Sequence, residues 1–343
     1  MRRTLTRLAA MLFGLVLVTG CADAADEQAA DIEDEPAAEE VADEQDSDEA
    51  PETTEEEGTE DEATEDEDAE PSPYVVDIVS EGHDFQLPEE IPSGWVTFRY
   101  HNDSDETHFA LLGDLAEGIT AQDSRDEVVP VFQEAMDLIN EGDPDAGFAQ
   151  FEHMPEWSAE TVYMGGPGFV APGGVAETTV YLEPGNYQVE CYVKTDGVWH
   201  TDSMLVDLTV TEEASGAPEP TSDFEVILTN DGLEIDGDVA AGEQTFAVDF
   251  AEQMLHGNAL WHDVHVARID DDTDLDELAA WMNWANPDGL EVPAPAEFIG
   301  GAQMMPEGST AYVTVDLEPG EYAFIAEVDD PDDKDMLQAV TVP

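Results

Sequence analysis

Alternating apolar and polar residues predict that most of the chain after residue 72 folds into β-strands. Val96, Phe98 and Tyr100 alternate with other residues, as expected for a strand with one buried face. The same kind of pattern, bounded by turn residues, predicts further strands at 108–112, 178–182, 187–192 and 205–210. Glycine and proline at 165–168 and 172–174 predict loops between these strands.

Two stretches have helical spacing instead. Residues 124–140 begin with Ser124 and Glu127 at the spacing of a capping box, and apolar residues follow at helical spacing. A second helix is predicted near 275–284. We interpret its Leu278, Trp281 and Trp284 as core residues, because aromatic residues at helical spacing usually pack inside.

The arrangement of strands occurs twice along the chain. Leu182-Glu-Pro-Gly-Asn-Tyr187 returns as Leu317-Glu-Pro-Gly-Glu-Tyr322. A tyrosine just after such a turn resembles a tyrosine corner, which fixes a crossover in a Greek-key sandwich. Residues 107–111 similarly return as 264–268, which pairs His108 with His265. We therefore predict an all-β fold of two homologous Greek-key β-sandwiches, each with a short helical insertion, at 73–213 and 223–343, joined by a linker at 214–222.

The first 21 residues predict a lipoprotein signal peptide. Three arginines precede an apolar run, Leu8 to Val18, that is too short to span a bilayer. The run ends in Val18-Thr19-Gly20-Cys21, which resembles the lipobox of bacterial and archaeal lipoproteins. That resemblance implies lipidation of Cys21, export, and anchoring to the outer face of the cytoplasmic membrane. An ordinary signal peptide is the alternative, and a partial twin-arginine match leaves the export route open.

The charge of the chain is strongly negative throughout. Residues 22–72 carry 26 Asp and Glu in 51 positions without Lys, Arg or aromatic residues, which predicts a disordered acidic tether. Residues 73–343 carry the remaining 59 acidic residues and only five basic ones. A formal net charge of -77 excludes a nucleic-acid binder. An acidic solvated surface resembles that of halophilic proteins, and a docking surface for a basic partner is the alternative.

Candidate metal chemistry is concentrated at 187–204, where Cys191, His200 and Met204 follow the first Pro-Gly-x-Tyr turn. Thiolate, imidazole and thioether donors suit copper that alternates between Cu(I) and Cu(II). A lone thiol in an exported chain also favours a metal ligand over a structural cysteine, which is the alternative. The stretch resembles the ligand loop of the cupredoxins, the blue-copper family. That resemblance implies one copper held by His108, Cys191, His200 and Met204.

The second repeat departs from this pattern. Counting from the shared tyrosine, Ala326 aligns with Cys191, and the loop at 329–333 has no histidine. We therefore expect no blue copper centre there. Met254, His256, Met304 and Met305 could form a soft Cu(I) patch, although methionine that fills gaps in a core is the simpler interpretation.

These residues bear on three classes of function. The leading prediction is electron transfer with an unidentified redox partner protein. The alternative is a copper-free cupredoxin-like module for binding, structure or copper sequestration at the cell surface. Two-domain multicopper oxidases and nitrite reductases resemble the chain in size, but they require further histidine clusters, and Glu190 stands beside Cys191 where such enzymes carry a histidine. The sequence-based prediction is therefore that the chain is not an enzyme.

Overall fold

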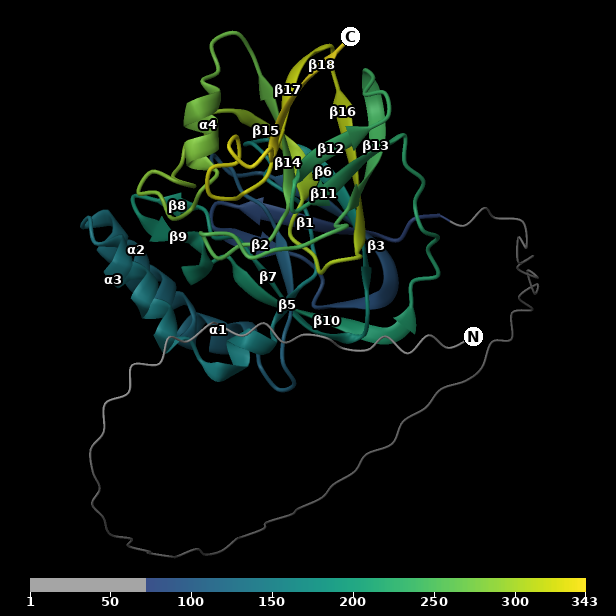
Figure 1. The fold of residues 1–343 in the computed structure, drawn as a ribbon. Helices are drawn as coiled ribbons and strands as arrows, with labels where there is room; N and C mark the ends of the chain where they lie inside the picture. Colours follow the sequence, from purple (N-terminus) through teal and green to yellow (C-terminus); the bar gives the residue numbers. More distant parts are fainter. Residues whose placement is uncertain (1–71) are drawn as a thin grey trace, which may run out of the picture. The chain divides into compact units, whose positions relative to one another are not determined.

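Strand β3 (Glu90–Asn102), labelled in Figure 1, contributes to both sheets of the first β-sandwich. In this computed structural model, which describes residues 72–343, Glu90 lies opposite Thr209 of β10 (Leu205–Ala214) in a parallel pair. Residues 94–101 pair antiparallel with β6 (Val175–Leu182). Gly94 separates the two pairings at φ +101°, a backbone conformation that favours glycine.

The first sandwich follows the alternation of the sequence. One sheet contains β1 (Val75–Glu81), β2 (Asp84–Gln86), β6 and most of β3, and the other contains β10, β7 (Gly185–Glu190), β4 (Leu111–Asp114) and β5 (Val162–Tyr163). A short ladder, β8 (Lys194–Thr195) with β9 (Val198–Trp199), lies between β7 and β10 in the chain. Val96, Phe98 and Tyr100 are fully buried, which confirms the predicted strand.

The helical insertion of the first half differs in detail from the prediction. It consists of α1 (Ala121–Glu127), α2 (Val129–Asn140), α3 (Pro144–Ala149) and two 3-10 turns, η1 (Gln150–His153) and η2 (Glu156–Glu160). The capping box is formed by Thr120 and Asp123, so α1 starts before the predicted Ser124. Pro130 in the first turn of α2 has no N–H to continue the ladder, which explains why one predicted helix is two.

The second half repeats the two-sheet plan. Its first sheet contains β12 (Gly232–Asp236), β11 (Phe224–Thr229), β13 (Gly242–Asp249) and β16 (Thr310–Leu317), and its second contains β15 (Glu297–Ala302), β14 (Val264–Ile269), β17 (Gly320–Ile325) and β18 (Leu337–Val342). Helix α4 (Leu275–Trp281) forms its insertion, and Leu278, Trp281 and Trp284 are buried as predicted. The all-β fold class is confirmed.

Both tyrosine corners have the same geometry. Tyr187 Oη donates to the Glu183 carbonyl at 2.9 Å, and Tyr322 Oη donates to the Glu318 carbonyl at 3.0 Å. In each half the bond joins the tyrosine to a backbone carbonyl four residues upstream, across the turn that enters β7 or β17. The repeated motif therefore fixes equivalent positions in the two halves.

The two halves are joined through a shared sheet. Strands β16 and β6 pair antiparallel, with Tyr312 opposite Thr179, so that one sheet continues from the first half into the second. Strand β10 extends to Ala214, the first residue of the predicted linker. Residues 72–343 belong to one compact unit, and the division at 214–222 stays a prediction.

Three sequence-based predictions lie outside the described part of the chain. These are the signal peptide at 1–21, its lipidation site Cys21, and the acidic tether up to residue 71. Among residues 72–343, no helix has the length and apolar character needed to cross a membrane.

Candidate metal centre

Three backbone segments bring the predicted histidine and cysteine ligands together. His108 precedes β4 and pairs with Val170, whose N–H donates to the His108 carbonyl at 2.8 Å. Cys191 directly follows β7, and its N–H donates to the Met204 carbonyl at 3.0 Å. His200 begins a short 3-10 turn, η3 (His200–Asp202), which returns the chain to β10. Sheet pairing and a tight turn therefore hold the three residues in place.

The donor atoms of His108, Cys191 and His200 converge. His108 Nδ1 lies 3.6 Å from Cys191 Sγ and 3.2 Å from His200 Nδ1, and one ligand atom from each of the three residues lies within 4.8 Å of the other two. All three residues are buried. Two imidazole nitrogens and a sulfur are the equatorial donors of a trigonal copper site. The residues therefore fit the predicted copper ion.

Burial sets the protonation of these donors. It lowers the pKa of His108 to about 4, with the neighbouring His83 contributing in the same direction. It also lowers the pKa of His200 to about 3, and His108 adds to this effect. The Cys191 thiol shifts the other way, because burial raises its pKa to about 12. At neutral pH both imidazoles can offer a lone pair, whereas the thiol must lose a proton before it can bind a metal.

A polar layer orients the His200 ring from outside. His200 Nε2 lies 2.9 Å from Thr195 Oγ1 and 3.4 Å from a Glu106 carboxylate oxygen. Thr195 Oγ1 donates to Glu106 at 3.0 Å, and His83 Nε2 lies 2.7 Å from the same oxygen. Because Nε2 is engaged by this layer, Nδ1 is left to face His108.

Sequence reasoning did not find His83, Glu106 or Thr195. They lie in the turn between β1 and β2, in the loop before His108 and in β8, respectively. No spacing connects the three residues, since only tertiary folding brings them around His200. The proximity of Glu106 to His108 in the chain is the one local signal.

Met204, the fourth predicted ligand, is fully buried beside the other three. Its carbonyl accepts from the Cys191 N–H, and its own N–H donates to the His200 carbonyl at 2.6 Å. These two bonds fix the Met204 backbone between the segments that carry the cysteine and the second histidine. Its role as a thioether ligand stays a prediction.

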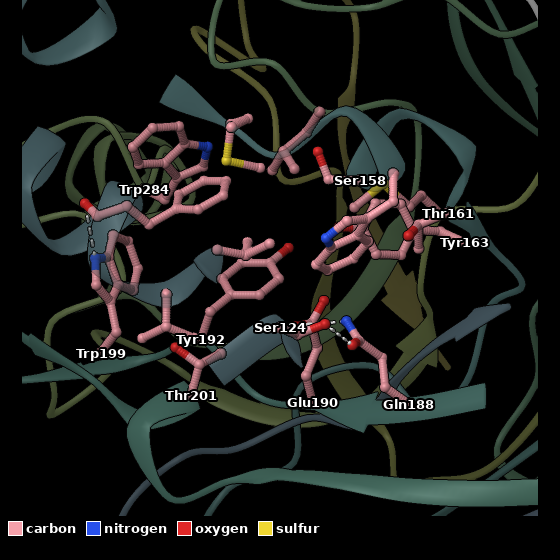
Figure 2. A pocket seen from close by; sticks show the side chains of 17 residues that line it. Ser124, Ser158, Thr161, Tyr163, Gln188, Glu190, Tyr192, Trp199, Thr201 and Trp284 are labelled. Carbon is pink, nitrogen blue, oxygen red and sulfur yellow. Dashed lines mark hydrogen bonds between the residues drawn. The ribbon is translucent and has the colours of Figure 1, made fainter. Parts of the chain in front are cut away.

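A pocket borders the candidate centre, between the helical insertion and β7 (Figure 2). Glu190 and Tyr192, the chain neighbours of Cys191, line it together with Trp199 and Thr201, the neighbours of His200. Its remaining wall includes Trp284 from the second half. A molecule bound in this pocket would therefore contact residues that are adjacent in the chain to two candidate ligands, Cys191 and His200.

The insertion also explains why β7 is buried on both faces. Ser124 Oγ donates to Gln188 Oε1 at 2.6 Å, and Gln188 Nε2 donates to Glu190 at 3.3 Å (Figure 2). The strand therefore buries Gln188 and Glu190 on the side away from Cys191. Burial raises the pKa of Glu190 to about 7, partly offset by the bond from Gln188.

Strand register corrects the histidine correspondence between the halves. Leu111 lies opposite Glu190, and His265 lies opposite Ile325. Glu190 and Ile325 each follow the corner tyrosine by three residues, so Leu111 and His265 are equivalent. His108 lies three residues before Leu111, and His262 lies three residues before His265. The counterpart of His108 is therefore His262 rather than the predicted His265.

His265 instead helps to join the two halves. Its Nδ1 accepts from the Phe169 N–H at 3.1 Å, and its Nε2 lies 3.0 Å from Asp263 Oδ2. Asp263 also accepts from the Glu327 N–H at 2.6 Å, and Tyr192 Oη lies 3.0 Å from Glu327 Oε2. Burial and Asp263 raise the pKa of Glu327 well above its usual range. Both His265 nitrogens therefore have partners, and the bond from Phe169 links the two halves.

Comparison with known proteins gives matches among solved structures only. No protein family model matches the sequence, and no curated protein matches it. Auracyanin A, a blue copper protein from Chloroflexus aurantiacus, is 20% identical over 41% of this chain and 100% of its own, with a TM-score of 0.26. The blue copper oxidase of Nitrosomonas europaea is 13% identical over 79% of this chain and 85% of its own, with a TM-score of 0.20.

A third similar structure is a copper-containing nitrite reductase from Thermus scotoductus. It is 12% identical over 79% of this chain and 61% of its own, with a TM-score of 0.20. Because solved structures similar to the chain include an oxidase and a reductase, the prediction that it is not an enzyme is wrong as an exclusion. Missing histidine clusters were too narrow a ground for it.

Proposed function

We propose, on the basis of the cupredoxin-like fold, that the chain is a mononuclear copper protein that transfers electrons. The observation that supports this proposal most directly is the convergence of His108, Cys191 and His200, each of which has a ligand atom within 4.8 Å of those of the other two. Copper bound there would supply one-electron chemistry by alternating between Cu(I) and Cu(II). The buried position of all three donors keeps bulk water away from this set.

The surrounding residues have separate tasks in this proposal. Thr195 and Glu106 fix the tautomer and orientation of His200 through Nε2. His83 stacks on the outer side of His200, with the ring centroids 4.1 Å apart, and its side chain is 42% exposed. His83 is therefore the accessible ring through which a partner protein would approach the centre.

The proposal places the chain outside the cell membrane, anchored by lipid at Cys21. This part rests on the arginine-rich start and the lipobox-like run that ends at Cys21. An extended acidic segment at 22–72 would then act as a spacer between the membrane and residues 72–343. The redox partner would be another exported protein.

A visible absorption spectrum of the full chain with Cu(II) tests the copper assignment. We expect an intense thiolate-to-copper band, lost in Cys191→Ser. Cys21→Ser is the matched control, because it removes the other cysteine of the chain; it should retain the band while releasing the protein from membranes. A wild-type chain without a visible band or stoichiometric copper would overturn the proposal and favour the copper-free binding module.

A further inference from the structure

The second half carries a pair of buried histidines whose ring nitrogens lack partners. Both nitrogens of His256, and Nε2 of His262, have no hydrogen-bond partner anywhere in residues 72–343. His262 Nδ1 lies 3.1 Å from the Glu252 carbonyl. His256 is 7% exposed and His262 is fully buried. Burying polar atoms without hydrogen-bond partners is unfavourable, so three such atoms in two neighbouring rings require an explanation.

The pair has the same spacing as the histidines of the first centre. The ring centroids of His256 and His262 are 4.9 Å apart at an interplanar angle of 47°. The corresponding values for His108 and His200 are 4.9 Å and 57°. Strand register makes His262 the counterpart of His108. His256 comes from the loop before it, so the second imidazole arrives from a different segment than His200 does.

A methionine occupies the position that corresponds to Met204. The Ala326 N–H donates to the Met336 carbonyl at 3.0 Å, just as the Cys191 N–H donates to the Met204 carbonyl at 3.0 Å. Met336 is buried, with 1% exposure. The second half therefore retains the first histidine and the methionine, replaces the cysteine by Ala326 and gains His256.

We propose that His256, His262 and Met336 form a second metal site, which takes Cu(I). Two neutral imidazoles and a thioether are soft, uncharged donors, and this set favours a monovalent soft ion. Burial and His262 lower the pKa of His256 to about 4, so the ring is neutral at neutral pH and one of its nitrogens can offer a lone pair. Without a thiolate the site gives no visible band, which separates it from the first centre.

Anaerobic titration of the reduced full chain with Cu(I), against a chromogenic Cu(I) chelator, tests this site. We expect two Cu(I) per wild-type chain and one in His262→Ala and in His256→Gln. The Cu(II) thiolate band should be unchanged in both variants. His153→Ala is the matched control, because His153 is exposed and lies in η1, and it should retain two Cu(I).

The variants also separate this proposal from the function of the first centre. Cys191→Ser combined with His108→Ala should lose the visible band and still bind one Cu(I). X-ray absorption of that Cu(I) should show nitrogen and sulfur neighbours, and Met336→Leu should remove the sulfur while preserving the far-ultraviolet circular dichroism of the fold. Binding of a single Cu(I) by the wild-type chain, or two Cu(I) in correctly folded His262→Ala and His256→Gln, would overturn the second site.

Discussion

The His83 ring stacks on the His200 ring, with centroids 4.1 Å apart and an angle of 28° between the planes. His200 is 2% exposed, whereas the side chain of His83 is 42% exposed. Glu106 contacts both rings, at 2.7 Å from His83 and 3.4 Å from His200. The His83 ring thus covers the candidate ligand His200, and solvent and partner proteins can reach His83.

Replacement of His83 by Ala should affect electron exchange more than copper binding. His83 is not among the three converging donors, so the visible band should persist. The second-order rate of reduction by a partner protein should fall several-fold, because the variant lacks the exposed ring at which the partner is proposed to approach the copper centre. Loss of the stack and of the bond to Glu106 should lower stability by about 1 kcal/mol. Stopped-flow kinetics measures the rate of reduction, and urea unfolding measures the stability. An unchanged rate would show that electrons do not reach the centre through His83.

Copper affinity of the first centre should depend on pH through the thiol alone. Cys191 has its pKa raised to about 12 by burial, so it binds a proton over the whole neutral range and releases it on metal binding. His108 and His200, with pKa values of about 4 and 3, are already neutral above pH 5. Affinity should therefore rise about tenfold per pH unit between about pH 5 and 8, for one proton released. Competition titrations that gave a steeper slope would mean that an imidazole also loses a proton.

The fold could be predicted because its signals are local. The alternation in β3 and the two Pro-Gly-x-Tyr turns each lie within a few residues, and the tyrosine corners form as expected. The predicted helix start at Ser124 was wrong, because the capping box is formed by Thr120 and Asp123. The buried Ser124 hydroxyl bonds Gln188, a residue distant in the chain, and that contact could not be inferred from a local motif.

The candidate site was predictable only in part, for the same reason. Cys191, His200 and Met204 occur in one loop, so their spacing was informative. His262 could not be matched to His108 from residue similarity, because the apolar residues around His265 resemble those around His108 more closely. Strand pairing with β17 decided the equivalence. His83 reaches the site from a turn whose sequence gives no sign of its neighbour.

Glu190 should make the stability of the metal-free protein depend on pH. Its pKa is about 7 in the folded state and about 4.3 in an unfolded chain, so the folded state binds the proton more tightly. The resulting stabilisation is complete below about pH 4 and is lost as the pH rises through 7. Glu190→Gln, which keeps the shape without a charge, should therefore gain up to about 3 kcal/mol relative to wild type between pH 4 and 8. Urea unfolding at both pH values measures this, and a pH-independent difference between the two proteins would contradict the buried charge.

The stability of the folded region should increase with salt. Of its five basic residues, Lys194 is fully buried, where its Nζ contacts the carbonyls of Trp284, Asn286 and Pro287. Arg99 is already paired with Glu177 at 2.7 Å, and Arg268 with Glu318. The 59 acidic residues at 73–343 are therefore left largely without opposite charge, and they repel one another in the compact state.

The Debye length, over which salt screens charges, shortens from about 10 Å at 0.1 M salt to about 3 Å at 1 M. The melting temperature should therefore rise over this range. NaCl and KCl should act alike, because screening depends on ionic strength; a melting temperature that stays constant across the series would show that self-repulsion does not limit stability.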